Sequence, residues 1–272
     1  MKETDTNGLL RERYGQLQAS IISAALDPVF LRHRSVRAYS DRPLSEGTIE
    51  ALVAAAQSAS TSSNLQAWSV ISIEKEETRR KLSELAGGQR HVAAAPLQLV
   101  WLADLSRLHA AAGEHNIVAD GVDFLEVFLV SVIDAAIAAQ NAAMAAESMG
   151  LGMVYIGALR NHPEQVAELL CLPERCFAVF GMCVGYADDK KPAQIKPRLP
   201  QAAVWFKEKY DIINQPEHVA AYDEESLRFY RAQNMEQKQW SIHSGNRIRG
   251  PESLNGRDQL SYALIRLGFP LK

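Results

Sequence analysis

The stretch of sequence that decides the fold spans residues 123–157 and reads DFLEVFLVSVIDAAIAAQNAAMAAESMGLGMVYIG. Residues 123–148 consist largely of alanine and large apolar side chains and contain neither glycine nor proline, which predicts one long helix. Gly150 ends this helix, and Met153–Ile156 follows as a short apolar strand that stops at Gly157. A helix with so many apolar residues is typical of a protein core, and we expect the other elements to pack around it.

The segment Leu129–Gly150 is also long and apolar enough to raise the question of a membrane span. Polar and charged residues are spread along it, and a span would not carry them without partners. They are Asp134, Gln140, Asn141 and Glu147. The first residues, MKETDT, are polar and acidic and lack the pattern of a signal peptide. We therefore expect a buried helix in a cytoplasmic protein that does not act at a membrane.

Short strands and helices lie on both sides of the long helix. We expect strands at residues 68–73, 97–102 and 176–186, helices at 9–26, 44–58, 76–85, 163–170, 218–239 and 258–267, and a loop at 243–258. Ser45 is the expected N-cap of the helix at 44–58. Prolines interrupt the chain repeatedly after Asp188. This order predicts an α+β or α/β sandwich of one domain with a C-terminal extension.

The composition is that of an ordinary globular protein. The chain has 272 residues, of which 47% are hydrophobic and 22% charged. Its formal net charge of −3 gives no reason to expect nucleic acid or an anionic membrane as a partner. The three cysteines show neither a disulfide framework nor the spacing of zinc ligands, so we expect no bound metal.

Two short basic clusters are candidates for binding an anion. The first is RHRSVR at residues 32–37, and the second is KPRLP at residues 196–200. Arginine forks match the oxygens of phosphate and carboxylate groups, and the prolines of the second cluster hold its backbone stiff. Taken alone, each cluster could equally be solvated surface charge.

Two loops could approach a ligand closely. STSSN at residues 60–64 offers hydroxyl and backbone N–H groups, although serine-rich loops are common. GGQ at residues 87–89 combines two permissive glycines with a glutamine that both donates and accepts hydrogen bonds. A helix C-cap would explain the glycines but not the glutamine.

The sequence lacks the motifs of several enzyme classes. It contains no Gly-x-Gly-x-x-Gly after a strand, no Walker A loop, no Gly-x-Ser-x-Gly elbow and no His-Glu-x-x-His pair. Anion-binding clusters without an evident acid, base or nucleophile indicate that a cofactor carries the chemistry.

Six of these stretches, in this order and spacing, resemble the nitroreductase superfamily, specifically its NADPH-preferring, oxygen-insensitive nitroreductase and flavin reductase group. They are HRSVR (33–37), SSNLQ (62–66), GGQRHVAAA (87–95), AAQNAAMAAESMGLGMVYIGALRN (138–161), LPERCFAVFGMCVGY (172–186) and KPRLP (196–200). The resemblance implies an α+β, three-layer α/β/α fold with a small mixed sheet and the long helix at its centre. It also implies a homodimer with FMN sites at the subunit interface. Residues 1–272 would form a single domain, in which 201–272 is an extension that contributes to the NADPH and acceptor sites.

The resemblance further implies a set of FMN contacts. They are His33, Arg34, Ser35, Arg37, Ser62, Ser63, Gln66, Gln89, Tyr155, Ile156, Gly157, Lys196 and Arg198. Lys196 and Arg198 would bind the phosphate, whereas Arg37 and Gln89 would face the pyrimidine edge of the flavin. A cation such as Arg37 stabilises the negative charge of reduced flavin. No side chain is expected to act as a catalytic acid, base or nucleophile.

The electron donor and acceptor follow from the same resemblance. Arg231, nine residues before Trp240, would meet the 2′-phosphate of NADPH. Glu236 stands where a second basic residue is expected, although Lys238 could replace it, and NADH remains a possible donor. Asn64 and Arg257 would lie near the acceptor.

We therefore expect an FMN-dependent NAD(P)H oxidoreductase that reduces nitroaromatics, quinones or similar electron-poor small molecules by ping-pong, two-electron hydride transfer. One alternative is an NAD(P)H:flavin reductase that supplies free reduced flavin. Another is a flavin-binding redox sensor without turnover.

Overall fold

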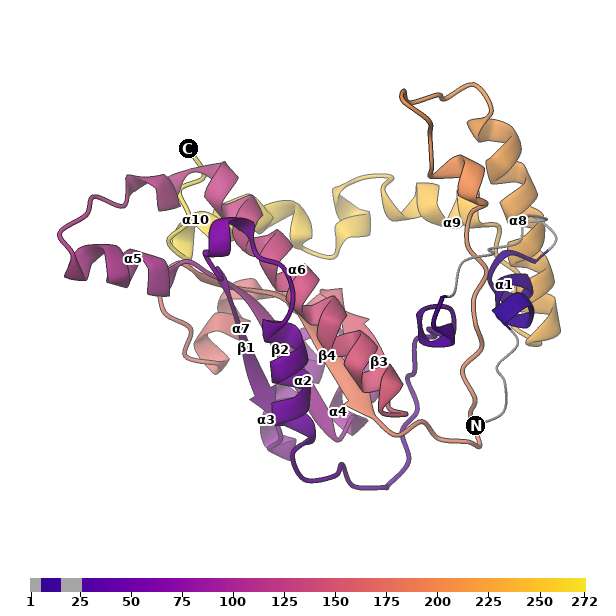
Figure 1. Cartoon of the computed structure of the whole chain (residues 1–272), viewed down its shortest axis with the longest axis horizontal. Helices are drawn as coiled ribbons and strands as arrows, with labels where there is room; N and C mark the ends of the chain where they lie inside the picture. Colours follow the sequence, from indigo (N-terminus) through magenta and orange to yellow (C-terminus); the bar gives the residue numbers. More distant parts are fainter. Residues whose placement is uncertain (1–5, 16–25) are drawn as a thin grey trace. The chain divides into compact units, whose positions relative to one another are not determined.

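The computed structural model describes residues 6–15 and 26–272 (Figure 1). Two compact units make up the chain. The smaller unit combines Met1–Arg34 with Gln194–Leu254, and the larger unit combines Ser35–Ala193 with Asn255–Lys272.

A four-stranded sheet lies at the centre of the larger unit. Its order is β1 (Trp68–Ile73), β2 (Leu97–Asp104), β4 (Cys176–Gly185) and β3 (Gly152–Ile156), and each strand runs antiparallel to its neighbours. All three strands predicted outside the 123–157 stretch are present. Every residue of β2 is buried, as expected for a largely apolar strand in the middle of a sheet.

The second half of the first basic cluster forms a short parallel bridge to the edge of β3. Ser35 pairs with Met153 in this bridge, and the Val36 backbone N–H donates to the Met153 carbonyl at 2.9 Å. Gly152 makes the approach possible, because a Cβ at this position would lie 2.5 Å from the Val36 side chain. The four strands form an antiparallel sheet and not the predicted mixed one, and this isolated parallel bridge lies outside those strands.

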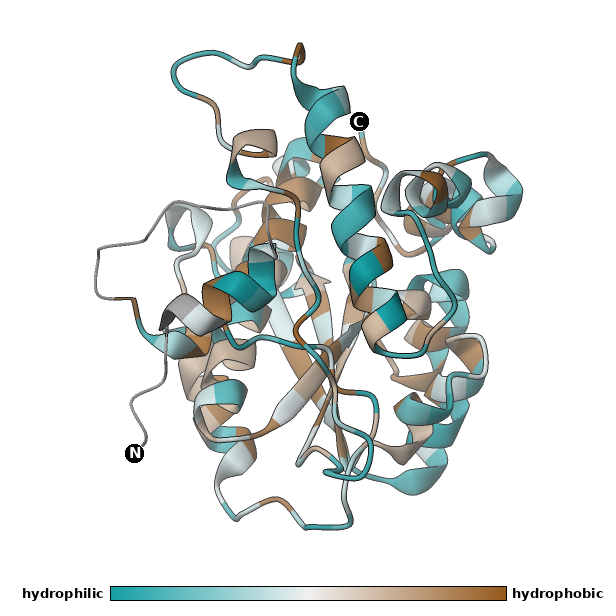
Figure 2. Ribbon diagram, turned by 90° about the vertical axis from the view of Figure 1, so that its right-hand side faces the viewer, coloured by the Kyte–Doolittle hydropathy of each residue, from teal (hydrophilic) through white to brown (hydrophobic). Residues whose placement is uncertain are grey.

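Helices cover both faces of the sheet. On one face, α2 (Thr48–Gln57) and α6 (Leu125–Ser148) pack against alternate residues of β2, from Leu97 to Trp101. The opposite face packs against α3, α4 and α7, which span Glu76–Leu85, Arg90–Ala94 and Pro163–Leu169. Figure 2 draws the strands in white and brown, whereas hydrophilic colours dominate many of the surrounding helices. The predicted three-layer α/β/α fold is confirmed.

The predicted long helix is α6. Most residues of its buried side are alanines, such as Ala138 and Ala142, which let the helix lie close to the sheet. Among the described residues it is the one helix with the length and hydropathy of a membrane span, and 44% of its most apolar window is buried. Leu129, Ile133 and Ile137 lie on its exposed side.

Helix ends and loops differ from prediction in three places. Ser45 is not an N-cap: α2 begins at Thr48, and its N-cap is Gly47 in the left-handed conformation at φ 78°. Residues 243–247 of the predicted loop are helical and belong to α9 (Trp240–Arg247). The predicted helix at 9–26 is observed as α1 (Thr6–Tyr14), and residues 16–25 of that prediction lie outside the described residues.

The remaining elements of the larger unit are α5 (Ser106–Glu114) and α10 (Leu260–Arg266). The smaller unit holds α1, α8 (Gln215–Ala232) and α9. The Tyr222 and Trp240 rings pack edge to face between α8 and α9, with centroids 5.7 Å apart, and the Ser241 N–H donates to Asp223 at 2.8 Å.

Candidate functional site

Within the smaller unit, one buried arginine ties residues 31–33, at the start of the first basic cluster, to the second basic cluster. The Arg13 guanidinium donates to the His33 carbonyl at 2.8 Å and to the Lys196 carbonyl at 2.9 Å. It also donates to the Leu31 carbonyl at 3.0 Å, and only 7% of Arg13 is exposed. In return, the Arg198 N–H donates to the Arg13 carbonyl at 2.8 Å. Segments 163 residues apart in the sequence, at His33 and Lys196, therefore share one anchor.

Aromatic side chains of α8 hold the second cluster. The Lys196 Nζ donates to the Tyr230 hydroxyl at 2.9 Å and lies 4.9 Å from the centroid of the same ring. The Tyr222 hydroxyl donates to the Pro197 carbonyl at 2.7 Å. Pro197 is buried, whereas Lys196 and Arg198 on either side of it are exposed. The loop therefore presents two cations on a fixed backbone, as the sequence predicts for an anion site.

Arg231 lies at the C-terminal end of α8, beside a small pocket. Its Nε donates to the Gln237 side chain at 3.2 Å. Gln237, Glu236 and Lys238 line a pocket of about 490 Å³, and Lys238 forms an ion pair with Glu236 at 3.1 Å. Glu236 thus forms an ion pair with Lys238, the one residue that could have replaced the basic side chain expected at position 236.

In the larger unit, the bridge to β3 sets the direction of Ser35 and Arg37. Val36 points inward and is 3% exposed, so its two neighbours face outward. Arg37 lies close enough to His91 to act on it electrostatically. Burial lowers the pKa of His91, and the charge of Arg37 lowers it further.

The GGQ loop lies next to the turn that follows β3. Gly87 and Gly88 take the left-handed conformation at φ 79° and 71°. A Cβ on Gly87 would lie 3.9 Å from the Asn161 side chain, whereas Gly88 faces open space. The Gln89 Nε2 donates to the Ala86 carbonyl at 2.8 Å, which fixes the side chain while its oxygen remains an acceptor.

The turn after β3 spans Gly157–Asn161 and also meets the loop that carries Arg257. A Cβ on Gly256 would lie 3.3 Å from the Asn161 carbonyl oxygen. Burial lowers the pKa of Arg160, and the charge of Arg257 lowers it further. The GGQ loop, the turn after β3 and the Arg257 loop are far apart in the sequence but lie next to one another in the structure.

Two buried polar atoms in this region have no hydrogen-bond partner among the described residues. They are the Asn161 Oδ1 and the His91 Nε2. Buried polar atoms are almost always hydrogen-bonded to protein, water or a ligand, so these two atoms make the region a candidate site for a polar ligand.

Tyr155 and Ile156 contribute differently from the other predicted contacts. The Tyr155 hydroxyl donates to Gln140 at 3.3 Å, and its ring packs edge to face on Phe180. Ile156 is 3% exposed and packs in the core beneath β3. Both side chains are thus engaged in packing, which leaves the backbone at the end of β3 as the part that could meet a ligand.

The polar loop at 61–67 has an unusual backbone. Ser63, Asn64 and Gln66 all take the left-handed conformation, at φ 49°, 54° and 51°. This conformation costs an L-residue roughly 1–2 kcal/mol, with asparagine at the lower end. All four predicted ligand contacts on this loop are exposed, namely Ser62, Ser63, Asn64 and Gln66. Other residues must therefore hold the loop in place.

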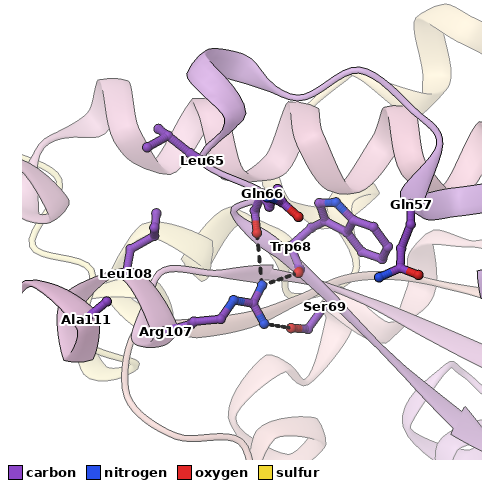
Figure 3. A pocket seen from close by; sticks show the side chains of 8 residues that line it. All are labelled: Gln57, Leu65, Gln66, Trp68, Ser69, Arg107, Leu108 and Ala111. Carbon is purple, nitrogen blue, oxygen red and sulfur yellow. Dashed lines mark hydrogen bonds between the residues drawn. The ribbon is translucent and has the colours of Figure 1, made fainter.

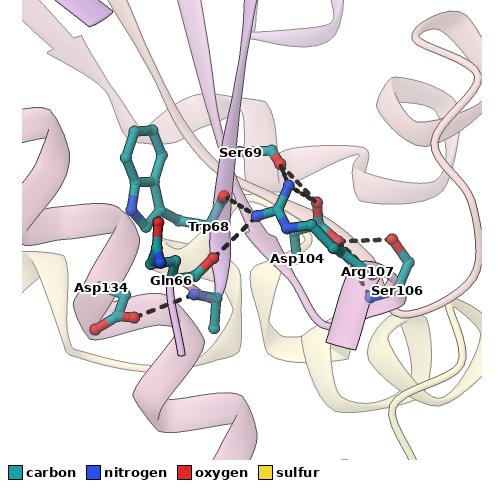
Figure 4. A network of polar contacts seen from close by, with 8 residues as sticks. Gln66, Trp68, Ser69, Asp104, Ser106, Arg107 and Asp134 are labelled. Atoms are coloured by element: carbon teal, nitrogen blue, oxygen red, sulfur yellow. Dashed lines mark hydrogen bonds and ion pairs between the residues drawn. The ribbon is translucent and has the colours of Figure 1, made fainter. Parts of the chain in front are cut away.

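Asp134 of α6 holds the loop from the inside. Its carboxylate is 1% exposed and accepts hydrogen bonds from the Thr61 hydroxyl at 2.5 Å and the Ser62 N–H at 3.0 Å. A third bond comes from the Ala67 N–H at 3.2 Å (Figure 4). Both ends of the loop are therefore fixed to one side chain of the central helix.

Arg107 holds the same loop from the outside. Its NH2 donates to the Gln66 carbonyl at 2.9 Å and to the Trp68 carbonyl at 2.8 Å, and NH1 donates to Ser69 at 3.2 Å (Figure 3). Arg107 also borders a pocket of about 480 Å³ together with Leu65.

Asp104 completes this network. Burial opposes ionisation of Asp104, but hydrogen bonds from Ser106 and Ser69 and the charge of Arg107 outweigh it, so that the pKa of Asp104 lies below its ordinary value. The Ser69 hydroxyl donates to Asp104 at 2.6 Å, and Arg107 lies 3.7 Å from the carboxylate.

The chain matches the model of the nitroreductase family over residues 31–186. It also matches the model of the nitroreductase family C-terminal domain over residues 196–272. The chain belongs to the nitroreductase family.

Relatives within the nitroreductase family support the assignment. FMN reductase [NAD(P)H] of Bacillus subtilis is 40% identical over 242 residues, which cover 88% of this chain and 90% of the relative. Oxygen-insensitive NADPH nitroreductase of Salmonella typhimurium is 40% identical over 213 residues, covering 78% and 85%.

Solved structures of similar proteins agree with the fold of this chain. NfrA1 nitroreductase from B. subtilis superposes with a TM-score of 0.84 at 36% identity and covers 90% of this chain and 98% of that one. NADPH:FMN oxidoreductase from Vibrio harveyi complexed with NAD+ gives a TM-score of 0.79 at 34% identity, with 90% and 98% covered.

Several residues that support the candidate site were not predicted. Arg13 and Arg107 lie on helices whose charged residues look like ordinary surface residues. Asn161 and His91 lie inside matched motifs, but only burial distinguishes them. Asp134 did carry a signal, because a carboxylate in the middle of an apolar helix needs hydrogen-bond donors.

Proposed function

We propose that this nitroreductase-family protein is an FMN-dependent NAD(P)H oxidoreductase that reduces nitroaromatics, quinones or similar electron-poor small molecules. The observation that carries the proposal is the group formed in the larger unit by Arg37, Gln89 and the turn after β3. Its unpartnered buried atoms, the Asn161 Oδ1 and the His91 Nε2, fit a ligand that both donates and accepts hydrogen bonds. The pyrimidine ring of a flavin is such a ligand.

The basic residues of the smaller unit, at 32–34 and 196–198, fit the phosphate of FMN. We assign Lys196 and Arg198 as its main ligands, with His33 and Arg34 as further donors. Arg13 and Tyr222 fix the backbones of these clusters, so little conformational entropy is lost on binding. A charge-assisted hydrogen bond from a fixed cation is the strongest kind available to a phosphate.

Bound FMN supplies the redox chemistry by accepting a hydride from NAD(P)H and passing it to the acceptor. The protein then needs to orient the reactants and stabilise charge, and not to supply an acid or base. Arg37 is placed to stabilise negative charge on the pyrimidine edge, and Gln89 offers a fixed carbonyl oxygen as an acceptor. Ser35, and the backbone at Tyr155, Ile156 and Gly157, would complete the contacts.

We assign Arg231 to the 2′-phosphate of NADPH. The pocket beside it, lined by Gln237 and Lys238, supports a binding site for the donor in the 201–272 extension. Because Glu236 pairs with Lys238, the cationic character of this pocket is weakened. We therefore propose that NADPH is preferred and that NADH is also used.

We place the acceptor near Asn64 and Arg257. A flavin reductase that releases free reduced flavin is the second candidate function, and it is favoured by the name of the relative FMN reductase [NAD(P)H]. The two functions differ in whether free flavin or another small molecule accepts the electrons.

We also propose a homodimer in the cytoplasm. The side of α6 that carries Leu129, Ile133 and Ile137 is apolar and exposed, at 44%, 53% and 41%. Such a stripe on a helix whose other side packs on the sheet is suited to a second copy of the chain.

Steady-state turnover of the purified protein tests the proposal. NADPH and NADH should each be combined with a nitroaromatic, a quinone and free FMN. We expect turnover with at least one acceptor and a lower KM for NADPH than for NADH. Turnover with free FMN alone would favour the flavin reductase, whereas no turnover with any pair in the presence of added FMN would contradict both.

A further inference from the structure

The 61–67 loop carries predicted ligand contacts but does not hold itself in place. Ser63, Asn64 and Gln66 are left-handed and exposed, and none of them is glycine. A strained backbone conformation of this kind persists only where surrounding groups fix it. The groups that do so here lie outside the predicted contacts (Figure 4).

We propose that Thr61, Asp134 and Arg107 are positioning residues that set the affinity of this protein for flavin and acceptor by holding the 61–67 loop in its left-handed conformation. The inference rests on the proposed function, because Ser62, Ser63, Asn64 and Gln66 are assigned there as ligand contacts.

Thr61 joins the two ends of the loop through two hydrogen bonds of its hydroxyl group. Its hydroxyl donates to the Asp134 carboxylate at 2.5 Å and accepts from the Gln66 N–H at 2.9 Å. One oxygen atom therefore joins the start of the loop, its end and the central helix. Because Asp134 is 1% exposed, water has little access to replace the lost bonds.

Arg107 fixes the end of the loop from the opposite side. Its charged donors meet the carbonyls of Gln66 and Trp68, and the Asp104 carboxylate orients the guanidinium. Bonds from a charged donor are stronger than those between neutral groups. The loop is thus held on its inner side by Asp134 and on its outer side by Arg107, and neither residue is an assigned ligand contact.

A defined kinetic signature follows from this arrangement. If the loop is in its binding conformation for only a fraction of the time, the apparent affinity for every ligand that touches it falls by that fraction. Saturating ligand restores the bound conformation. Loss of a positioning residue should therefore raise the dissociation constant for FMN and the KM for the acceptor but leave kcat nearly unchanged.

Thr61 offers a matched pair of variants for the test. Thr61→Val removes the hydroxyl and keeps the shape, whereas Thr61→Ser keeps the hydroxyl. We expect Thr61→Val to raise the acceptor KM and the FMN dissociation constant about tenfold, with kcat at saturating FMN and acceptor within about twofold of wild type. Thr61→Ser should stay within about twofold in all three quantities. Equal behaviour of the two variants would overturn the proposal, as would a lower kcat in Thr61→Val with unchanged KM.

Arg107 gives an independent test because its side chain is 54% exposed, so its loss should not unfold the protein. Arg107→Gln is too short to reach both carbonyls, and we expect the same rise in KM and dissociation constant. Arg80→Gln is the control, since Arg80 is 63% exposed and pairs only with Glu84 among the contacts described. If Arg107→Gln matches Arg80→Gln, Arg107 does not position the loop.

Hydrogen–deuterium exchange of the full-length protein provides a readout without turnover. Peptides that contain Gln66 and Ala67 should exchange about tenfold faster in Thr61→Val than in Thr61→Ser without FMN, and saturating FMN should reduce this difference. Unchanged exchange would refute the positioning role directly. If wild type failed to bind FMN while exchange still responded to Thr61→Val, the proposed function would fail and the structural role of Thr61 would stand.

Discussion

Substitution of Arg13 tests how the smaller unit builds its anion site. Arg13→Gln removes a guanidinium that donates to the carbonyls of Leu31, His33 and Lys196 at 2.8–3.0 Å. A hydrogen bond from a charged group contributes about 1.5–3 kcal/mol. The bond to Leu31 is buried, whereas water can partly replace the two that are part-buried.

We therefore take the full free energy of the buried bond to Leu31, about 2 kcal/mol, as the free energy needed to order both clusters in the variant. If binding of the FMN phosphate must supply this energy, the dissociation constant rises about 30-fold, since every 1.4 kcal/mol is tenfold. The dissociation constant for FMN is measured by the quenching of flavin fluorescence as FMN is titrated with the protein.

Arg11→Gln is the control for this prediction, because Arg11 lies on the same helix and is exposed. We expect its dissociation constant to match that of wild type within about twofold. An Arg13→Gln protein that is folded by circular dichroism and binds FMN as tightly as Arg11→Gln would refute the idea that Arg13 organises the phosphate site.

Three further predictions concern the ligands and the loop. Lys196→Ala combined with Arg198→Ala should weaken FMN binding by at least 100-fold, since two charge-assisted bonds of about 1.5–3 kcal/mol are lost; unchanged flavin content of the purified double variant would refute the phosphate assignment. Arg231→Ala should raise the KM for NADPH about tenfold or more and change that for NADH little, and equal changes would show that Arg231 does not bind the 2′-phosphate. The lowered pKa of Asp104 means that its contribution to stability is present above the unfolded carboxyl pKa of about 3.9 and is lost as the pH falls through the lower folded value; Asp104→Asn should therefore flatten the acid limb of thermal stability against pH, and a limb parallel to wild type would exclude this role.

Strong local patterns made the central layers predictable from the sequence. The alanine-rich composition of residues 123–148 determined α6, and the apolar runs before and after it determined the strands of the sheet. Where competing local signals met, prediction failed. Ser45 looked like an N-cap, but Gly47 can adopt φ 78° without cost and starts the helix there.

The supports of the site could not be predicted because they depend on long-range contacts. The left-handed conformation of Ser63 and Gln66 could not be predicted locally, since the neighbouring residues Ser62 and Ala67 are bound to Asp134, 67 or more residues away. Arg13 likewise reads as a surface charge until the carbonyls of two distant segments are seen to surround it. The motifs thus locate the expected ligand contacts, and only the structure reveals what holds them.

Anaerobic titration of the flavin-free protein with FMN, followed by NADPH, tests the central claim most directly. The account predicts that each chain binds one FMN and that NADPH then bleaches the visible absorbance of the bound oxidised flavin. Addition of a nitroaromatic or quinone should restore the absorbance. A protein that binds no FMN, or whose bound FMN keeps its colour with both NADPH and NADH, would contradict the account.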